Sequence, residues 1–554
     1  MPASYIERIL RARVYDVAIE SPLTRADLLS RRLGNQVHLK REDLQPVFSF
    51  KLRGAYNKLA HLSAEARAAG VIAASAGNHA QGVALGASRL GIQATIVMPR
   101  TTPVIKAQAV RRLGGKAVLH GDSYDEAQAH ALALAEERAL TFIHPFDDPE
   151  VIAGQGTIGM ELLRQHRDPP DAIFVPVGGG GLIAGIAAYV KYVYPEVRIV
   201  GVEPEDAPTL ERALAADQPV MLERVGLFAD GVAVRRIGEE TFRVARETVD
   251  EMVLVSSDEI CAAIRDIFDD TRGIAEPAGA LAVAGLKRYV HEKAIVDQSL
   301  IAIESGANVN FDRLRHIAER AELGERREAL LAVEIRERPG SFLSFCRALG
   351  RRQITEFNYR FADRERAQVF VGVELGGGDQ ERAELIARLE AKGLRVIDMT
   401  TNETAKLHIR FMVGGHAPGL ENEQLIRFEF PERPGALLDF LSGLGKGWNI
   451  SLFHYRNHGA AYGRVLMGIQ APAAERPVLL RQLDDLGYRY WEETDNPAYQ
   501  LFAGSVGWAR EDARGHGAGD QGGDERPAPE GEDADGRRGK EDRDPEGVLV
   551  RSIQ

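Results

Sequence analysis

Residues 1–320 alternate between short, continuous apolar runs and longer runs with helical periodicity. The apolar runs are rich in β-branched residues, which is typical of strands that are buried on both faces of a parallel sheet. We expect strands at residues 37–40, 70–75, 94–98, 117–120, 172–177, 198–203, 252–255 and 299–305. We expect helices between them, at residues 57–70, 78–91, 103–115, 123–140 and 183–193. This order predicts an α/β fold with helices on both faces of its sheets.

Residues 325–500 have a different pattern, and they contain a repeat. The spacing between the two copies changes by one residue along their length, which indicates duplication rather than chance. The recurring motifs are Glu-Arg-Pro-Gly at 337–340 and 432–435, and Ile-x-x-Phe-x-Tyr-Arg at 354–360 and 450–456. Each copy follows the order strand, Pro-Gly turn, helix, strand, strand, helix and short strand, which predicts a ferredoxin-like α+β domain. We expect these domains at residues 328–400 and 423–495.

The composition is that of an ordinary soluble globular protein, with 44% hydrophobic and 27% charged residues in a chain of 554. A formal net charge of −12 argues against a broadly basic nucleic-acid-binding surface. The two cysteines supply no disulfide framework, and no group of cysteines and histidines has the spacing of a zinc site. We therefore expect no nucleic-acid partner and no metal.

The chain has no apolar run near the roughly 18 residues that a membrane-spanning helix needs. At the N-terminus, Glu7 and Asp16 interrupt the apolar periodicity, which is unlike secretory signals and transit peptides. We expect a cytoplasmic protein without a membrane partner. Residues 505–554 are rich in charge and glycine and poor in apolar side chains, so we expect a disordered acidic tail there.

Three segments carry candidate chemistry, and the first is Ser-Phe-Lys-Leu-Arg-Gly-Ala at residues 49–55. A partly desolvated Lys51 beside Arg53 would have a lowered pKa and could form a Schiff base with an aldehyde. Most lysines are surface cations, so this segment alone does not decide between the two interpretations.

The second segment, Ser75-Ala76-Gly77-Asn78, follows an expected strand directly and opens an expected helix. Backbone N–H groups at a helix start, together with the side chains of Ser75 and Asn78, can hold an anion or an oxygen atom. The alternative is an ordinary Ser/Asn helix cap. His79 is expected to be a packing residue rather than a base.

The third segment is the run of four glycines before Leu182: Gly178, Gly179, Gly180 and Gly181. Such a backbone can wrap around an anion, and the dipole of the following helix favours negative charge. Consecutive glycines are costly in an ordered structure, so phosphate binding is the expected reason for them. The pattern also fits a loosened dinucleotide motif, with Glu203 as its ribose-binding acid, which leaves a nicotinamide enzyme open.

These segments, with Ser305-Gly306-Ala307-Asn308 after a late strand, occur in an order that resembles the fold type II enzymes, which use pyridoxal phosphate. SFKLRGA, SAGNHAQGVA, VPVGGGGL, VGLFADGVAV, AEPAGALA and SGANVN are similar to the motifs of biosynthetic threonine dehydratases. The resemblance extends to about residue 504 and implies a catalytic region at 1–320 with two parallel-sheet subdomains. Serine dehydratases and racemases share the active-site motifs, and the tandem repeat distinguishes the biosynthetic group from them.

The resemblance implies a role for each matching residue. Lys51, next to Phe50, would hold pyridoxal 5'-phosphate covalently and act as the general base. Asn78 would contact the ring oxygen and Ser305 the pyridine nitrogen. Residues 178–182 would hold the phosphate, and residues 75–78 would bind the carboxylate of L-threonine. The implied reaction yields 2-oxobutanoate and ammonia, the first step of isoleucine biosynthesis.

The repeats resemble ACT-like regulatory domains, which implies inhibition by isoleucine, activation by valine and a homotetramer. Candidate effector residues are Pro339, Gly340, Tyr359, Pro434, Gly435 and Tyr455. These turns and aromatic residues could equally be structural. Serine dehydratase or racemase activity stays open. A non-catalytic amino-acid sensor also stays open, although a protein without catalytic activity would not need Lys51, Asn78, the four glycines and Ser305 together.

Overall fold

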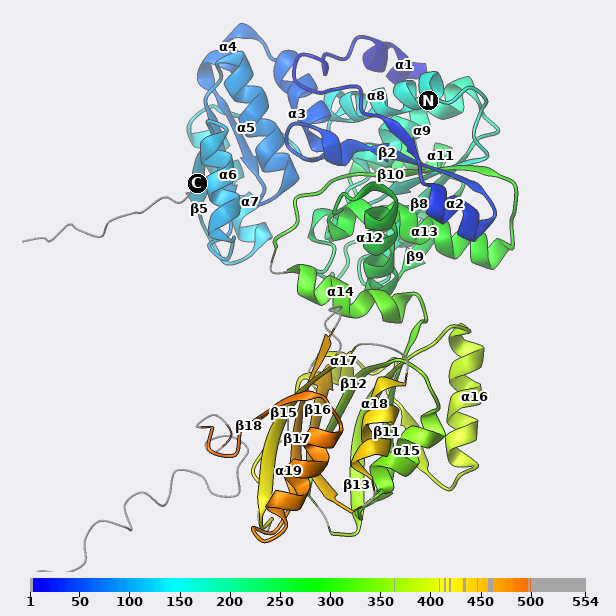
Figure 1. The fold of residues 1–554 in the computed structure, drawn as a ribbon. Coiled ribbons are helices and arrows are strands. Elements are labelled where there is room, and N and C mark those ends of the chain that lie inside the picture. Colours follow the sequence, from blue (N-terminus) through cyan, green and yellow to red (C-terminus); the bar gives the residue numbers. More distant parts are fainter. Residues whose placement is uncertain are drawn as a thin grey trace, which may run out of the picture.

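A computed structural model describes residues 3–311, 313–362, 364–407, 409–412, 415–417, 420–431, 435–445, 447–456, 462–496 and 499. The expected tail at 505–554 and the candidate residue Pro434 lie outside the described residues. Two α/β sheets form the N-terminal part, and one long antiparallel sheet forms the C-terminal part (Figure 1). None of the helices in the described ranges is long and apolar enough to span a membrane.

The larger N-terminal sheet has six strands. Their order is β1 (Leu23–Arg25), β2 (Gln36–Arg41), β10 (Ser299–Glu304), β7 (Ala172–Pro176), β8 (Arg198–Pro204) and β9 (Glu251–Val255). All neighbours are parallel except β1 and β2. Every residue of β7 is buried, as expected for a strand with helices on both faces. The expected strands are present, and β1 is an addition whose three residues are too few to show a period.

The smaller sheet has four parallel strands. Their order is β5 (Lys116–Leu119), β4 (Ala94–Met98), β3 (Val71–Ala74) and β6 (Thr141–Phe142). The helices around it are α5 (Asn78–Leu90), α6 (Val104–Arg112) and α7 (Tyr124–Glu137). The sheet confirms three expected strands and adds the two-residue β6, which is too short for a sequence signal.

One helix expectation is wrong. Residues 57–70 do not form a single helix, because α3 (Lys51–Ala60) ends and a second helix, α4 (Ala64–Ala69), begins. The side chain of Ser63 accepts a hydrogen bond from the backbone N–H of Ala66 and caps α4. The hydrophobic period runs across both helices and conceals this cap.

Helix α3 lies very close to α8 (Pro149–Gln165). A Cβ added at Gly54 would lie 2.6 Å from the carbonyl oxygen of Val151, so only glycine permits this approach. Beneath the contact, the guanidinium of the fully buried Arg53 pairs with Glu42 at 2.8 Å and with Glu161 at 2.5 Å. These contacts hold the N-terminal turn of α3, where Lys51 lies, in one position.

The two sequence repeats form one eight-stranded antiparallel sheet. The first contributes β11 (Glu328–Arg336), α15 (Ser341–Leu349), β12 (Ile354–Arg360), β13 (Arg366–Glu374), α16 (Gly378–Glu390) and β14 (Arg395–Asp398). The second contributes β15 (Glu423–Pro431), α18 (Ala436–Leu444), β16 (Asn449–Arg456), β17 (Tyr462–Gln470), α19 (Arg476–Asp485) and β18 (Arg489–Glu492). Strands β12 and β16 join the repeats, and the four helices share one core on one face of the sheet (Figure 1). The ferredoxin-like expectation is confirmed.

Helix α14 (Arg313–Gly324) leads from the N-terminal part into β11, and α17 (Glu403–Leu407) lies between the repeats (Figure 1). The ammonium of Lys406 on α17 lies 2.7 Å from the carboxylate of Asp258, at the start of α12 (Ser257–Thr271). Asp258 also pairs with Arg320 on α14. Charged side chains therefore connect the segment between the repeats to the N-terminal part.

Candidate active site

Lys51 is the first residue of α3. Its Nζ donates a hydrogen bond of 3.0 Å to the carbonyl oxygen of Pro145 and lies 5.3 Å from the centre of the Phe50 ring. Burial lowers the pKa of Lys51 to about 8, although the carboxylate of Glu276 opposes this shift. A substantial part of the amine is therefore neutral at mildly alkaline pH, and the neutral amine is the form that attacks an aldehyde.

The segment before Lys51 pairs with the end of β10. Ser49 forms an antiparallel bridge with Gly306, and the N–H of Phe50 donates to the carbonyl oxygen of Ser305 at 3.3 Å. Ser305 is buried, and its hydroxyl donates to the carbonyl oxygen of Ala278 at 3.3 Å. The structure thus brings together two segments that are about 250 residues apart in the chain.

Asn78 begins α5 and faces two polar side chains. Its Nδ2 donates to Oε1 of Glu276 at 2.6 Å, and its Oδ1 accepts from Nδ2 of Asn308 at 2.7 Å. Glu276 precedes α13 (Pro277–Lys293), and burial raises the pKa of Glu276 to about 7. Glu276 was not among the predicted site residues, and its only local signal is its place immediately before a helix-starting proline.

Residues 75–77 form the connection from β3 to α5. The hydroxyl of Ser75 accepts hydrogen bonds from the N–H groups of Gly77 and Ala80, both at 3.3 Å, so it acts as a cap. A Cβ added at Gly77 would meet nothing within 4 Å, so the connection borders open space. The capping and ligand-binding interpretations are therefore compatible here.

His79 is a packing residue as expected: its Nε2 contacts the carbonyl oxygen of Ile143 at 2.9 Å, and burial lowers its pKa to about 3.

The four glycines connect β7 to α9 (Gly181–Val193). A Cβ added at Gly179 would lie 2.2 Å from the ring of Phe146, and one at Gly178 would lie 2.9 Å from Cα of Val232. Gly180 has a φ of +88°, a conformation that favours glycine. The loop therefore needs glycine for close contacts as well as for its conformation, and it ends at the N-terminus of a thirteen-residue helix.

Residues 144–148, which were not among the predicted site residues, connect the lysine to the glycine loop. Pro145 accepts the hydrogen bond from Lys51, while the ring of Phe146 packs on Gly179. Asp147 accepts from the N–H of Glu240 at 2.9 Å, and Asp148 caps α8. Asp147 therefore attaches the connection to the start of α11 (Glu239–Thr248), and Asp148 attaches it to the start of α8.

The carboxylate of Glu203 is already occupied and cannot bind a ribose. It is fully buried and accepts hydrogen bonds from the N–H groups of Leu210 at 2.7 Å and Glu211 at 3.0 Å. It therefore caps α10 (Thr209–Ala216), and burial raises its pKa to about 8. This removes the acid that the dinucleotide interpretation of the glycine loop requires.

The residues of the site fit pyridoxal phosphate. Lys51 supplies an amine of lowered pKa that can react with the aldehyde. The amide of Asn78 and the hydroxyl of Ser305 supply polar groups for the ring. The glycine loop at the start of α9 can hold the phosphate. The loop has no side chains of its own that would occupy the space an anion needs.

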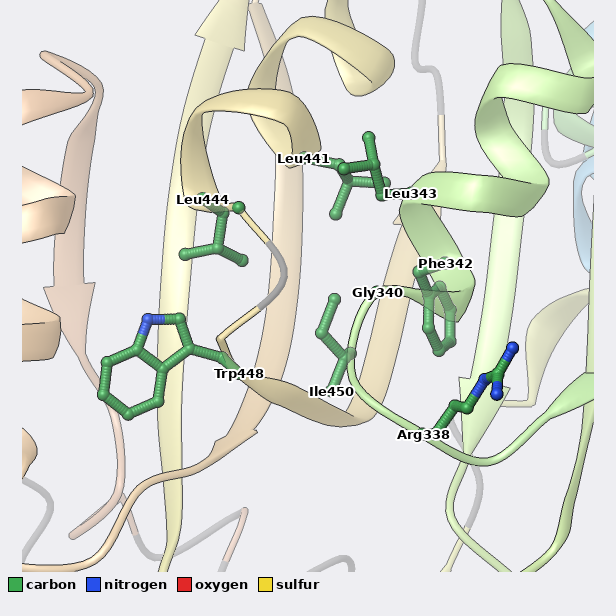
Figure 2. Close-up of a pocket in the computed structure, with 9 residues that line it drawn as sticks. Arg338, Gly340, Phe342, Leu343, Leu441, Leu444, Trp448 and Ile450 are labelled. Carbon is green, nitrogen blue, oxygen red and sulfur yellow. The ribbon is translucent and has the colours of Figure 1, made fainter.

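A pocket in the C-terminal part lies between α15 and α18 (Figure 2). It is lined by Arg338, Gly340, Phe342, Leu343, Leu441, Leu444, Gly445, Trp448 and Ile450. Of the candidate effector residues, only Gly340 is among these lining residues. Gly340 and Gly435 each have a φ of +82°, and each immediately precedes a helix. Pro339 belongs to the turn before α15. Tyr359 and Tyr455 are buried, and the Tyr359 hydroxyl donates to Glu337. The apolar lining residues carried no sequence signal beyond ordinary core periodicity.

Comparison with known proteins places the chain within an established group. Residues 14–306 match the family model described as pyridoxal-phosphate dependent enzyme. Residues 319–409 and 414–503 match the model described as C-terminal regulatory domain of threonine dehydratase.

Full-length relatives and a solved structure agree with these matches. The biosynthetic L-threonine dehydratase IlvA of Burkholderia multivorans is 58% identical over 501 residues, which cover 90% of this chain and 99% of that protein. Its Escherichia coli counterpart is 54% identical over 90% of this chain and 97% of its own length. The processed form of threonine deaminase isoform 2 from Solanum lycopersicum is 53% identical with a TM-score of 0.57, over 58% of this chain and 88% of that one.

Proposed function

This chain belongs to the pyridoxal-phosphate-dependent threonine dehydratases, and from that premise we propose that it converts L-threonine to 2-oxobutanoate and ammonia. The observation that carries the proposal is the position of Lys51. Its partly buried amine donates to the carbonyl oxygen of Pro145, and the adjacent Phe146 packs on the glycine loop. Residues 145 and 146 therefore keep the amine of Lys51 close to the loop that we propose for the phosphate.

We propose that Lys51 holds the cofactor, with Phe50 beside it, and that the loop Gly178–Leu182 holds its phosphate. Asn78 would donate to the ring oxygen, and Ser305 would face the ring nitrogen. When bound, pyridoxal phosphate supplies an electron-withdrawing ring that makes the α-carbon of an attached amino acid more acidic.

The amine of Lys51 then acts as the general base at the α-carbon of the substrate. A general base works best when its pKa lies near the working pH, and burial brings the pKa of Lys51 to about 8. The carboxylate of the substrate would bind to the N–H groups of the connection Ser75, Ala76, Gly77 and Asn78. Open space next to Gly77 supports this placement.

We propose that isoleucine inhibits the enzyme and valine opposes it, through the C-terminal regulatory domains at 328–400 and 423–495. An effector changes activity only if it binds the active and inactive states with different affinities. The match of residues 319–409 and 414–503 to the regulatory-domain model supports effector binding in this part of the chain. We also propose that the protein works as a homotetramer in the cytoplasm.

An assay of the purified full-length chain tests the proposal. With pyridoxal phosphate present, L-threonine should yield 2-oxobutanoate, and titration calorimetry should show isoleucine binding. L-Serine is the comparison substrate. Turnover of serine with none of threonine, or formation of D-serine, would contradict the proposed substrate and favour a serine dehydratase or racemase.

A further inference from the structure

The side chain of Asn78 is held at both ends of its amide. Nδ2 donates to Oε1 of Glu276 at 2.6 Å, and Oδ1 accepts from Nδ2 of Asn308 at 2.7 Å. Asn308 is itself fixed, because its Nδ2 also donates to the carbonyl oxygen of Val47 at 2.8 Å. Three side chains from α5, the start of α13 and the segment after β10 therefore form one chain of hydrogen bonds.

This chain determines which way the amide faces. An asparagine amide has two N–H donors on Nδ2 and one oxygen. Glu276 takes one N–H and Asn308 takes the oxygen, so a single N–H of Asn78 remains for another acceptor. Turning the amide over would place Oδ1 against the carboxylate of Glu276 and would leave Nδ2 facing the amino group of Asn308. The contact with Asn308 would then bring two N–H donors together, and the contact with an ionised Glu276 would be repulsive, which is costly in a buried site.

Glu276 has little freedom to release Asn78. Its side chain is 5% exposed, and its backbone N–H donates to the carbonyl oxygen of Gly306 at 3.0 Å. A Cβ at Gly306 would lie 2.8 Å from its Oε1, and one at Gly231 would lie 3.5 Å from the same oxygen. Two glycines thus make room for the carboxylate and keep it directed at Asn78.

We propose that Glu276 is a positioning residue, which orients the amide of Asn78 so that its remaining N–H faces the ring oxygen of pyridoxal phosphate. The inference rests on the proposed function, because it assigns the free N–H to that cofactor. Glu276 acts through Asn78 and not on the substrate. Its effect should therefore appear in cofactor affinity and should depend on the presence of Asn78.

The test measures the dissociation constant of pyridoxal phosphate from the full-length apoprotein by fluorescence titration. We expect Asn78→Ala and Glu276→Ala each to weaken binding about tenfold, the effect of losing one hydrogen bond worth about 1.4 kcal/mol. The double variant should bind no more weakly than Asn78→Ala alone, because Glu276 acts through that side chain. Glu276→Gln replaces Glu276→Ala if the latter does not fold, and it should weaken binding several-fold.

Glu203→Gln is the matched control, since it replaces another buried glutamate of raised pKa, which caps α10 and contacts none of these residues. It should leave the dissociation constant unchanged. Fully additive losses in the double variant, or wild-type affinity in both Glu276 variants, would overturn the inference. If the wild-type protein itself binds no pyridoxal phosphate, the proposed function fails instead, so the two failures are distinguishable.

Discussion

The side-chain nitrogen of Lys51 lies 3.0 Å from the carbonyl oxygen of Pro145, a residue 94 positions later in the chain. The next residue, Phe146, occupies the space that a Cβ of Gly179 would need. One short connection therefore touches both the lysine and the glycine loop. An amine and an anion-binding loop arranged in this way can hold the two ends of one small molecule, an aldehyde at one end and a phosphate at the other.

The first prediction concerns the protonation of Lys51. Burial lowers its pKa to about 8, so the neutral fraction of the amine should rise as the pH increases through 8 in the apoprotein. Competitive labelling with acetic anhydride, followed by peptide mass spectrometry, measures this for each lysine. Lys58, on the same helix and ion-paired with Asp148, is labelled in the same sample and serves as the internal reference for recovery of the peptides. A midpoint for Lys51 above pH 10 would contradict the described environment.

The second prediction concerns the glycine loop. In Gly179→Ala, the new methyl group would lie 2.2 Å from the ring of Phe146, so the connection 144–148 must shift. We expect a large loss of pyridoxal phosphate affinity, measured by dialysis, and partial recovery in the double variant with Phe146→Ala. Gly447→Ala, at a position where a Cβ meets nothing within 4 Å, should behave like the wild type. Unchanged affinity in Gly179→Ala would show that this contact does not shape the loop.

The third prediction concerns the charges beneath α3. Arg53 is fully buried between Glu42 and Glu161, and Arg53→Met would leave both carboxylates without their main partner. Removing one member of a buried ion pair costs about 3–5 kcal/mol, so the melting temperature should fall strongly. Arg11→Ala breaks an exposed pair with Glu7 and should change stability by less than about 1 kcal/mol. Equal melting temperatures for the two variants would show that the buried network contributes little.

The sequence predicted most of the fold because buried parallel strands and amphipathic helices carry strong periodic signals. It missed β1 and β6, which have three and two residues, and it merged α3 with α4 across the cap at Ser63. In the site, four consecutive glycines are unusual by themselves, whereas Lys51 and Asn78 were predicted because the order of the motifs resembles that of a known family. Phe146 carries no local signal, and the proline after Glu276 marks only a helix start, because the roles of both residues come from contacts with residues that are distant in sequence.

The fourth prediction concerns the connection between the two parts of the chain. Lys406 is buried and lies 2.7 Å from Asp258, so it joins the segment between the repeats to α12. If isoleucine acts through the C-terminal domains, Lys406→Met should raise the isoleucine concentration for half-inhibition several-fold and leave the uninhibited kcat unchanged. Lys392→Met, at an exposed turn, should change neither quantity. Unaltered inhibition in Lys406→Met would place the coupling elsewhere.

The central claim is that Lys51 holds pyridoxal phosphate covalently, and borohydride reduction tests it most directly. Reduction of the purified holoprotein fixes the cofactor on the amine that carries it, and peptide mass spectrometry then identifies the residue. We predict a single phosphopyridoxyl group on Lys51 and none in Lys51→Ala. A modified peptide elsewhere in the chain, or an unmodified Lys51 in protein saturated with pyridoxal phosphate, would contradict the account.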